Sequence, residues 1–345
     1  MTRVLWILPP KTSYNSGVYQ YSFNLIEGLR DEIIIDETNL PDGVYRYIYQ
    51  FFLLPIKLLF VSEYYSNVIF YDESMSYLTI FTRKKSILII HDVRFEKSNT
   101  LRERMKSIYM KINFFFVKFA HKVVTVSHYT KRSVEQKLKV NVADVVYNII
   151  GHGSKNNTIP DTFIRKSIPF KSKKIVLNIG SHESRKNIKK MVDVVDLLGD
   201  GFHFIQAGRP IDGAAFNDNI VYAQKKQIGF TFLGEIEQSQ LSYLYSNSEI
   251  YLNLSSFEGF GRTPVEAQSF GLKVFSTTVG GLREALEVGF ISLSDSDSPS
   301  AIAYEIKKVL DSKEKMENVQ RDGYVNYSRF SRQTVCNDFL EVIDA

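Results

Sequence analysis

Short apolar runs alternate with helical patterns along the whole chain, and this alternation limits the fold more than any other feature. Runs of this length, without polar alternation, are typical of parallel strands that are buried on both faces. The clearest runs are Val4–Leu8, Val68–Tyr71, Ile87–Ile90, Val123–Val126, Ile175–Ile179 and Tyr251–Leu254. Strands that alternate with helices in two successive halves predict an α/β fold. We expect two doubly wound, Rossmann-like domains that face each other across a cleft.

The length of 345 residues is sufficient for two domains of ordinary size. Residues 151–173 contain glycines, prolines and polar clusters without periodicity, which is typical of a linker. We therefore predict one domain over residues 1–165 and a second over residues 166–329.

Composition agrees with a folded protein of a reducing compartment. The chain is 44% hydrophobic and 23% charged. Its single cysteine, Cys336, excludes an internal disulfide, so we expect a cytoplasmic protein. The first residues, Arg3–Pro10, are too short for the apolar core of a signal peptide and are interpreted as a first strand.

A second constraint is the stretch from Ser255 to Ala267, SSFEGFGRTPVEA, which follows a predicted strand. Gly259 and Gly261 allow a backbone to approach a ligand closely. Pro264 suits the first position of a helix, Thr263 could cap its free amides, and Gly271 could end it in the left-handed conformation. A strand, a glycine-rich turn and a helix N-terminus together predict a phosphate-binding site.

Two carboxylates bracket this turn. Glu266 stands three residues after Thr263, which is the spacing of a capping box, so its role could be to close the helix. Glu258 has no such structural explanation, because it lies in a loop beside two glycines. We therefore interpret the stretch as a ligand site and leave both roles open for Glu266.

The same residues resemble a known family. EGFGRTPVEA, with seven residues between Glu258 and Glu266, is similar to the Glu-x7-Glu signature of retaining GT-B glycosyltransferases of family 4 (glycosyltransferase group 1). The resemblance implies that Glu258 meets hydroxyls of a donor sugar and Glu266 the ribose of the nucleotide. It also implies that the backbone at Gly259, Phe260, Gly261 and Thr263 faces sugar and diphosphate. Arg262 departs from the usual GFGLP.

Further segments resemble the family along most of the chain. Gly17 matches the glycine-rich start of its first helix, and His91 the His-Asp pair that faces donor and acceptor. In the second half, Lys186 of Arg185-Lys186-Asn187 matches the lysine that binds the diphosphate, and Gly234 lies in the segment beside the base. Arg185 is the candidate for the family's phosphate arginine, because Ser181 occupies the usual position. Residues 330–345 resemble the last helix, which packs back on the first domain.

The resemblance implies an enzyme that moves a hexose-type sugar from a UDP-sugar or a GDP-sugar to a hydroxyl of a glycan or lipid-linked acceptor, as in polysaccharide biosynthesis. His91, Glu258 and Lys186 would be its catalytic residues. No tightly bound cofactor and no metal is expected, and Asp295–Asp297 is interpreted as a loop. A non-catalytic sugar-nucleotide-binding or scaffold subunit is the alternative.

The net charge of +5 comes from the basic N-terminal half. A basic half could face nucleic acid, an anionic membrane or an acidic substrate. We expect no nucleic acid as a partner, and peripheral contact with an anionic membrane, at the inner membrane face, is one of the options. Two apolar segments bear on this. For Val44–Phe60 we expect first a buried helix and second a membrane-contacting one. Leu101–Ala120 is either a core helix with a solvated face or a helix that docks on an anionic membrane.

Overall fold

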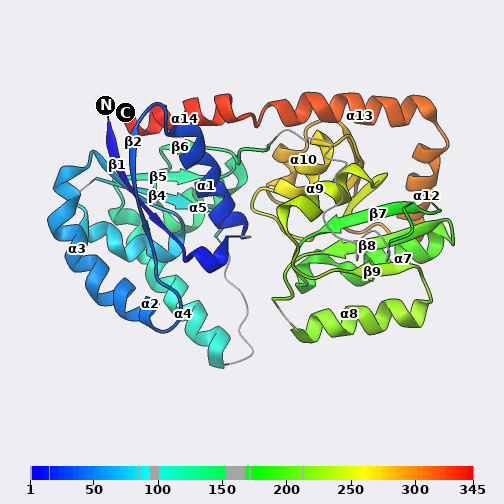
Figure 1. The fold of residues 1–345 in the computed structure, drawn as a ribbon, viewed down its shortest axis with the longest axis horizontal. Helices are drawn as coiled ribbons and strands as arrows, with labels where there is room; N and C mark the ends of the chain where they lie inside the picture. Colours follow the sequence, from blue (N-terminus) through cyan, green and yellow to red (C-terminus); the bar gives the residue numbers. More distant parts are fainter. Residues whose placement is uncertain are drawn as a thin grey trace. The chain divides into compact units, whose positions relative to one another are not determined.

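The computed structural model describes residues 2–14, 16–83, 85–93, 101–151, 168–170, 172–211 and 213–344. The chain divides into two compact units, one of residues 1–149 with 332–345 and one of residues 150–331. In the described part, each unit contains one six-stranded parallel sheet with helices around it (Figure 1). The predicted α/β fold is confirmed. The predicted domain boundary between residues 165 and 166 falls outside the described residues.

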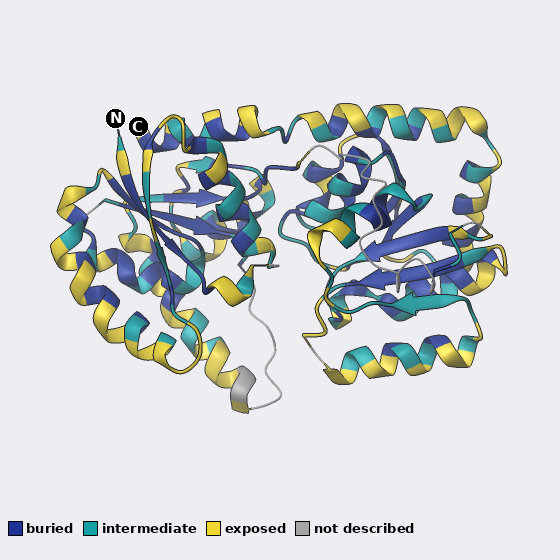
Figure 2. Cartoon of the chain, viewed as in Figure 1, coloured by how far each residue is buried: buried dark blue, intermediate teal, exposed yellow. Residues whose placement is uncertain are grey.

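The sheet of the first unit has the strand order β2-β1-β3-β4-β5-β6. Its strands are β1 (Arg3–Leu8), β2 (Ile34–Asn39), β3 (Asn67–Phe70), β4 (Ser86–Ile90), β5 (Lys122–Thr125) and β6 (Asp144–Val145). The central strands β3 and β4 are buried at every position, as Figure 2 shows for the interior of this sheet. Burial on both faces explains why these strands are apolar throughout instead of alternating.

Helices and short helical turns connect these strands. They are a 3-10 turn (Lys11–Ser13), α1 (Gly17–Leu29), α2 (Tyr45–Ile48), a π-helical turn (Tyr49–Leu53), α3 (Leu54–Val61), a 3-10 turn (Ser62–Tyr64), a 3-10 segment (Glu73–Phe81), α4 (Leu101–Phe116), a 3-10 turn (Val117–Phe119) and α5 (His128–Leu138). Ser127 caps α5 as predicted, because its Oγ accepts from the amide of Thr130 at 3.0 Å. The last helix of the chain, α14 (Arg332–Asp344), packs on this unit, where Phe339 stacks on Trp6 at 5.4 Å.

The second unit has the strand order β12-β11-β10-β7-β8-β9. Its strands are β7 (Lys174–Ile179), β8 (Phe202–Ala207), β9 (Phe230–Phe232), β10 (Ile250–Asn253), β11 (Lys273–Thr277) and β12 (Phe290–Leu293). Its helices are α7 (Ile188–Leu198), α8 (Gly213–Lys226), α9 (Gln238–Ser246), α10 (Arg262–Ser269), α11 (Leu282–Ala285), α12 (Pro299–Leu310) and α13 (Lys313–Ser328). Phe330, expected at the start of the last helix, is buried in this unit, and α14 begins two residues later.

The prediction of a buried helix for Val44–Phe60 is wrong. The segment is helical, but most of its apolar side chains are exposed; Phe52 is 67% exposed and Phe60 68%. Only Gln50, Leu54, Pro55 and Leu58 are buried. The π-helical turn at Tyr49–Leu53 directly precedes Leu54-Pro55. Pro55 has no N–H to donate to a carbonyl of that turn, so the regular α-helical hydrogen bonding is interrupted there. In the described residues, no helix is long and apolar enough to cross a membrane.

Candidate active site

The site lies where the strand order of the second unit reverses. β7 and β10 are neighbours in the sheet, with Ile250 opposite Val176 and Tyr251 opposite Leu177. The chain continues from β7 to β8 on one side, and from β10 to β11 on the other. The loops that follow these two strands therefore separate and leave a crevice at the carboxyl edge, which is where open α/β sheets bind ligands.

The loop after β7 carries the basic residues into this crevice. A 3-10 turn at Ser184–Lys186 ends at Asn187, which has a left-handed conformation (φ 53°) before α7 begins. The side-chain amide of Asn187 donates to the carbonyl of Leu254 at 2.8 Å, and the amide of Ser256 donates to the carbonyl of Arg185 at 2.8 Å. These bonds fix the loop after β7 against the loop after β10.

Lys186 and Glu258 form an ion pair between the loops after β7 and β10. Lys186 Nζ lies 2.6 Å from Glu258 Oε1, and Ser255 Oγ donates to the same oxygen at 2.9 Å. The second carboxylate oxygen of Glu258 lies 3.2 Å from Arg185 Nη1. Burial raises the pKa of Glu258, but Lys186 and Arg185 together outweigh burial and hold this pKa below its usual value. Glu258 is therefore an anion that holds two cations in position.

Arg185 has an incomplete set of partners among the described residues. Its Nη1 donates to the carbonyl of Phe257 at 3.0 Å, and its Nη2 pairs with Glu183 at 2.8 Å. Its Nε is buried and has no hydrogen-bond partner in this part of the chain. A buried N–H without an acceptor is costly, so an anionic oxygen that reached it would be bound favourably.

The start of α10 differs from the prediction. Gly261, with φ 101°, is the N-cap, and no side chain caps the helix. Thr263 lies inside the first turn, where its Oγ1 accepts from the hydroxyl of Tyr251 at 2.7 Å. Pro264 is the third helical residue and not the first. The prediction that Thr263 caps the helix is therefore wrong. A helix start without a side-chain cap keeps its amides available to an anion.

Glu266 does not close a capping box either. Its Oε1 pairs with Arg262 Nε at 2.7 Å, one turn earlier, and its Oε2 accepts from the hydroxyl of Tyr245 at 3.0 Å. Arg262 Nη1 is buried without a hydrogen-bond partner among the described residues. The site therefore contains a second carboxylate–guanidinium pair besides Arg185–Glu258. Its arginine has one N–H group that could donate to a ligand.

The glycines of the site allow backbones to pack closely. Gly280 has φ 60°, and a Cβ there would overlap the carbonyl oxygen of Glu258. A Cβ at Gly281 would overlap the carbonyl oxygen of Gly259, and the amide of Gly281 donates to Glu258 O at 2.9 Å. The Gly280–Gly281 turn thus supports the loop that carries Glu258. Phe260 points away into the core, edge-on to Phe330 at 5.2 Å.

Gly234 lies just beyond β9 on the same carboxyl edge. It has φ 66°, and its carbonyl accepts from the amide of Gly208, which follows β8, at 2.6 Å. A Cβ at Gly208 would overlap the carbonyl oxygen of Gly180, which follows β7. The loop ends of three neighbouring strands therefore meet through glycines.

Gly17 and His91 lie in the first unit, where Gly17 begins the helix after β1 and His91 follows β4 directly. Gly17 is the first residue of α1, with open space around its α-carbon. The ring of His91 packs edge-on against Tyr21 of α1 at 5.1 Å. Its Nε2 lies 3.0 Å from the carbonyl of Tyr71, so Nε2 is the protonated nitrogen and Nδ1 is left as an acceptor. Burial lowers the pKa of His91 to about 4.

Two half-buried acids next to His91, Asp72 and Glu73, have pKa values shifted in the opposite direction. The amide of His91 donates to Glu73 Oε2 at 3.1 Å. Burial raises the pKa of Asp72 to about 6 and that of Glu73 well above its usual value. The contribution of neutral His91 to the stability of the folded protein decreases as the pH falls from 6.5 toward 4. The contribution of the two protonated acids decreases in the other direction, as the pH rises over this range.

A His91→Asn variant is therefore expected to lose stability relative to the unaltered protein as the pH rises from about 4 to about 6, because the variant lacks the stability that His91 contributes increasingly over this range. The measurement is the melting temperature of both proteins across this range. Parallel pH profiles would contradict the neutral, buried state of His91. His203, whose pKa burial also lowers to about 4, contributes equally to both proteins and cancels in the comparison.

Some residues of the site were missed by the sequence analysis: Tyr245, Tyr251, Ser255, Arg262 and, in the first unit, Glu73. Arg262 and Glu266 are four residues apart on a helix, a spacing that could have revealed their pairing. The tyrosines belong to α9 and β10 and reach α10 only through the fold, so no local pattern marks them.

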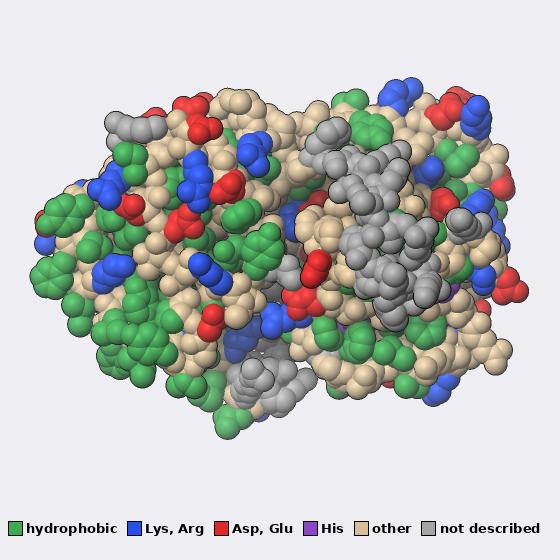
Figure 3. All heavy atoms as spheres, in the orientation of Figure 1, with side chains coloured by type: hydrophobic (Ala, Val, Ile, Leu, Met, Phe, Trp, Pro, Cys, Tyr) green, Lys and Arg blue, Asp and Glu red, His purple; other side chains and the backbone are tan. Residues whose placement is uncertain are grey.

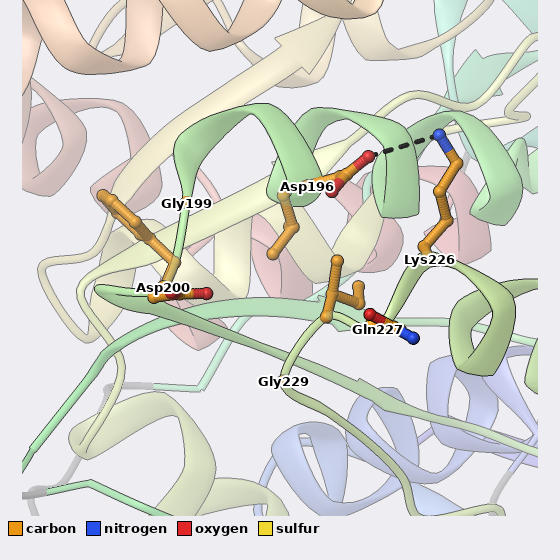
Figure 4. A pocket seen from close by; sticks show the side chains of 9 residues that line it. Asp196, Gly199, Asp200, Lys226, Gln227 and Gly229 are labelled. Carbon is orange, nitrogen blue, oxygen red and sulfur yellow. Dashed lines mark hydrogen bonds and ion pairs between the residues drawn. The ribbon is translucent and has the colours of Figure 1, made fainter.

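A different pocket lies at the amino-terminal edge of the second sheet, between the end of α7 and the start of β9 (Figure 4). Its cation, Lys226, is paired with Asp193 at 3.0 Å and with Asp196 at 3.2 Å. It lies at the opposite edge of the sheet from the site described above. No group of three or more His, Cys, Asp or Glu side chains that could hold a metal ion occurs in the described residues.

Comparison with known proteins finds a family match for part of the chain. Residues 160–325 match the family described as "Glycosyl transferases group 1". The chain is 24% identical over 226 residues to the O-antigen chain mannosyltransferase RfbU of Salmonella typhimurium, covering 64% of this chain and 60% of that protein. It is 25% identical over 276 residues to the alpha-1,3/1,6-mannosyltransferase ALG2 of Dictyostelium discoideum, covering 69% and 65%. The chain thus spans less than two thirds of either relative.

Among solved structures, the fold is similar to that of Alr3699/HepE from Anabaena, crystallised with UDP and glucose. The TM-score is 0.80 over the full length of both chains, at 15% sequence identity. The sequence match and the fold match thus agree: residues 160–325 match glycosyl transferases of group 1, and the fold is that of GT-B glycosyltransferase structures.

Proposed function

We propose that the protein is a retaining glycosyltransferase that moves a hexose-type sugar from a nucleoside diphosphate sugar to a hydroxyl of a glycan or lipid-linked acceptor. The observation that supports this most is the Lys186–Glu258 pair at 2.6 Å, at the point where the strand order of the second sheet reverses. A buried pair of this kind can present a fixed cation to a departing phosphate and a fixed carboxylate to sugar hydroxyls.

Each site residue has a proposed role in this reaction. The bond between the anomeric carbon and the diphosphate oxygen breaks, the acceptor oxygen forms the new bond, and the acceptor's proton leaves with the nucleoside diphosphate. Lys186, Arg185 and the uncapped amides of α10 would stabilise the charge that develops on the diphosphate. Glu258 would orient the sugar. Glu266 would give up its ion pair with Arg262 and accept hydrogen bonds from the ribose hydroxyls instead.

The remaining assignments are also proposals. The backbone at Gly259, Gly261 and Thr263 would approach the sugar and diphosphate, Gly234 the base, and Gly17 and His91 the sugar. The nucleotide would be UDP or GDP, and the setting would be polysaccharide assembly in the cytoplasm. The similarity to named mannosyltransferases favours catalysis over a binding or scaffold role.

A donor screen tests the proposal. One UDP-sugar or GDP-sugar is expected to raise the melting temperature and to be slowly cleaved, which releases the nucleoside diphosphate. Glu258→Ala should lower that release about a hundredfold, because the sugar is no longer oriented and Lys186 loses its counter-ion. Glu317→Ala, at an exposed position of α13, is the control.

Two results would count against the proposal. If no nucleotide sugar raises the melting temperature, the second unit does not bind such donors. If a donor binds and Glu258→Ala turns it over at the normal rate, the role given to Glu258 is wrong.

A further inference from the structure

The outer side of the first unit carries many exposed apolar side chains. Along the helical run from Tyr45 to Val61, the exposed ones are Tyr45, Tyr47, Ile48, Phe51, Phe52, Leu53, Ile56, Leu59 and Phe60. On α4 and the turn after it, they are Leu101, Met105, Ile108, Ile112, Phe115 and Phe119. Figure 3 shows hydrophobic side chains gathered over α2 and α3. Proteins rarely expose apolar patches of this extent unless they bind something there.

The two segments form one continuous surface. Phe51 lies edge-on to Tyr109 of α4, with ring centroids 6.1 Å apart, and stacks on Tyr77 at 5.5 Å. The side-chain amide of Gln50 donates to the hydroxyl of Tyr109 at 3.2 Å. The helical run and α4 are thus joined along a packed seam, and their apolar side chains lie on either side of it. We call this the α2–α4 face.

On α4 the exposed residues follow a single stripe. The exposed apolar residues of α4 and of the 3-10 turn after it recur at intervals of three and four residues, which keeps them on one side of a helix. They are Met105, Ile108, Ile112, Phe115 and Phe119. A core helix would bury this stripe. Here the buried residues are Asn113, Phe114 and Val117, on the opposite side, so the helix has a second apolar side that nothing in the described chain covers.

The exposed charged residues that the structure describes on this face are all basic. They are Lys57, Arg104, Lys111 and Lys118. Residues 43–62 and 104–120 contain no aspartate or glutamate. Lys118 lies over the ring of Phe115, with Nζ 3.8 Å from its centroid. Cations interleaved with aromatic and aliphatic side chains, without carboxylates, are typical of a helix face that lies in the headgroup region of an anionic membrane.

We propose that the α2–α4 face docks on an anionic lipid bilayer. The apolar side chains would enter the boundary between headgroups and acyl chains, and the lysines would remain among the lipid phosphates. A second copy of the chain fits the face less well, because pairing it with itself would bring cations together without carboxylates to offset them. This proposal goes beyond the proposed function and does not depend on it.

Co-sedimentation with vesicles tests the docking. At low salt the protein is expected to pellet with vesicles of equal parts phosphatidylglycerol and phosphatidylcholine, with at least about tenfold stronger partitioning than with phosphatidylcholine alone. Salt should weaken the binding, since the charges are exposed. Absence of pelleting with the anionic vesicles at low salt would overturn the proposal.

Two variants separate the apolar from the charged contribution. Phe52→Ser/Phe60→Ser removes two highly exposed rings, and Lys111→Glu/Lys118→Glu reverses two exposed charges on α4. Each is expected to weaken partitioning about tenfold or more. Because all four side chains are exposed, melting temperatures should change little, and either pair suffices if the other fails to fold. Tyr304→Ser/Val325→Ser, at 66% and 61% exposed positions of the second unit, should bind as the unaltered protein does.

Analytical ultracentrifugation tests the competing explanation. A monomer in the absence of lipid is expected. A dimer that Phe52→Ser/Phe60→Ser dissociates, together with no vesicle binding, would assign the face to self-association and overturn the proposal. The donor screen is carried out without vesicles, so a failure of membrane docking and a failure of the proposed activity are distinguished.

Discussion

Replacing Lys186 by alanine is expected to reduce turnover of the preferred nucleotide sugar by about a hundredfold to a thousandfold. Lys186 is a buried cation between the loops after β7 and β10. Among the described residues, it is the lysine that forms an ion pair with Glu258. The measurement is the rate of nucleoside diphosphate release at saturating donor. Lys189→Ala is the matched control, because that lysine lies three residues further on and pairs with the exposed Asp218.

Loss of stability must be separated from loss of catalysis in this experiment. Lys186→Ala leaves Glu258 buried with Arg185 as its remaining ion-pair partner, which costs up to about 3 kcal/mol of unfolding free energy. The double variant Lys186→Met/Glu258→Gln removes both charges and should recover most of this loss without recovering turnover. If the double variant regains turnover, the pair has a structural role alone.

Replacing Gly280 by alanine is expected to lower the free energy of unfolding by about 3 kcal/mol and to abolish donor binding. The left-handed backbone (φ 60°) disfavours any side chain by about 1 kcal/mol, and the new methyl group would overlap the carbonyl oxygen of Glu258. The loop that carries Glu258 would have to move. Urea unfolding measures the first effect, and the donor-induced melting shift measures the second.

Gly43 provides the control for this experiment. It has nearly the same φ, 67°, but a Cβ there would meet nothing within 4 Å. Gly43→Ala should therefore lower the free energy of unfolding by only about 1 kcal/mol, which is the cost of placing a side chain on left-handed backbone. Equal losses for the two variants would mean that the contact between Gly280 and Glu258 does not support the site.

The architecture of the second unit was accessible from the sequence. The strands β7, β10 and β11 are short, apolar and bounded by glycines or polar turns, so their periodicity identifies them. Lys186 and Glu258 were both named as site residues. Their direct pairing could not be predicted, because it arises from the adjacency of β7 and β10, which depends on the topology of the sheet. Their catalytic roles stay predictions.

The errors have a common cause, because a local sequence pattern does not specify the tertiary surroundings of a side chain. Val44–Phe60 is apolar enough for a core helix, yet the core needs only one side of it, which Leu54 and Leu58 provide. At α10, Thr263 had the right chemistry for an N-cap, but Gly261 takes that position because its backbone is left-handed. Tertiary context decided both cases.

The ion pairs around Lys186 also determine how the site responds to salt and to small anions. Arg185 and Lys186 face Glu183 and Glu258, so these four side chains carry no net charge together. Free phosphate entering such a cluster must compete with carboxylates that are already bound, and long-range attraction is weak. A leaving diphosphate would be held by directed hydrogen bonds more than by excess charge, which favours its release after each turnover and makes its binding only weakly dependent on ionic strength.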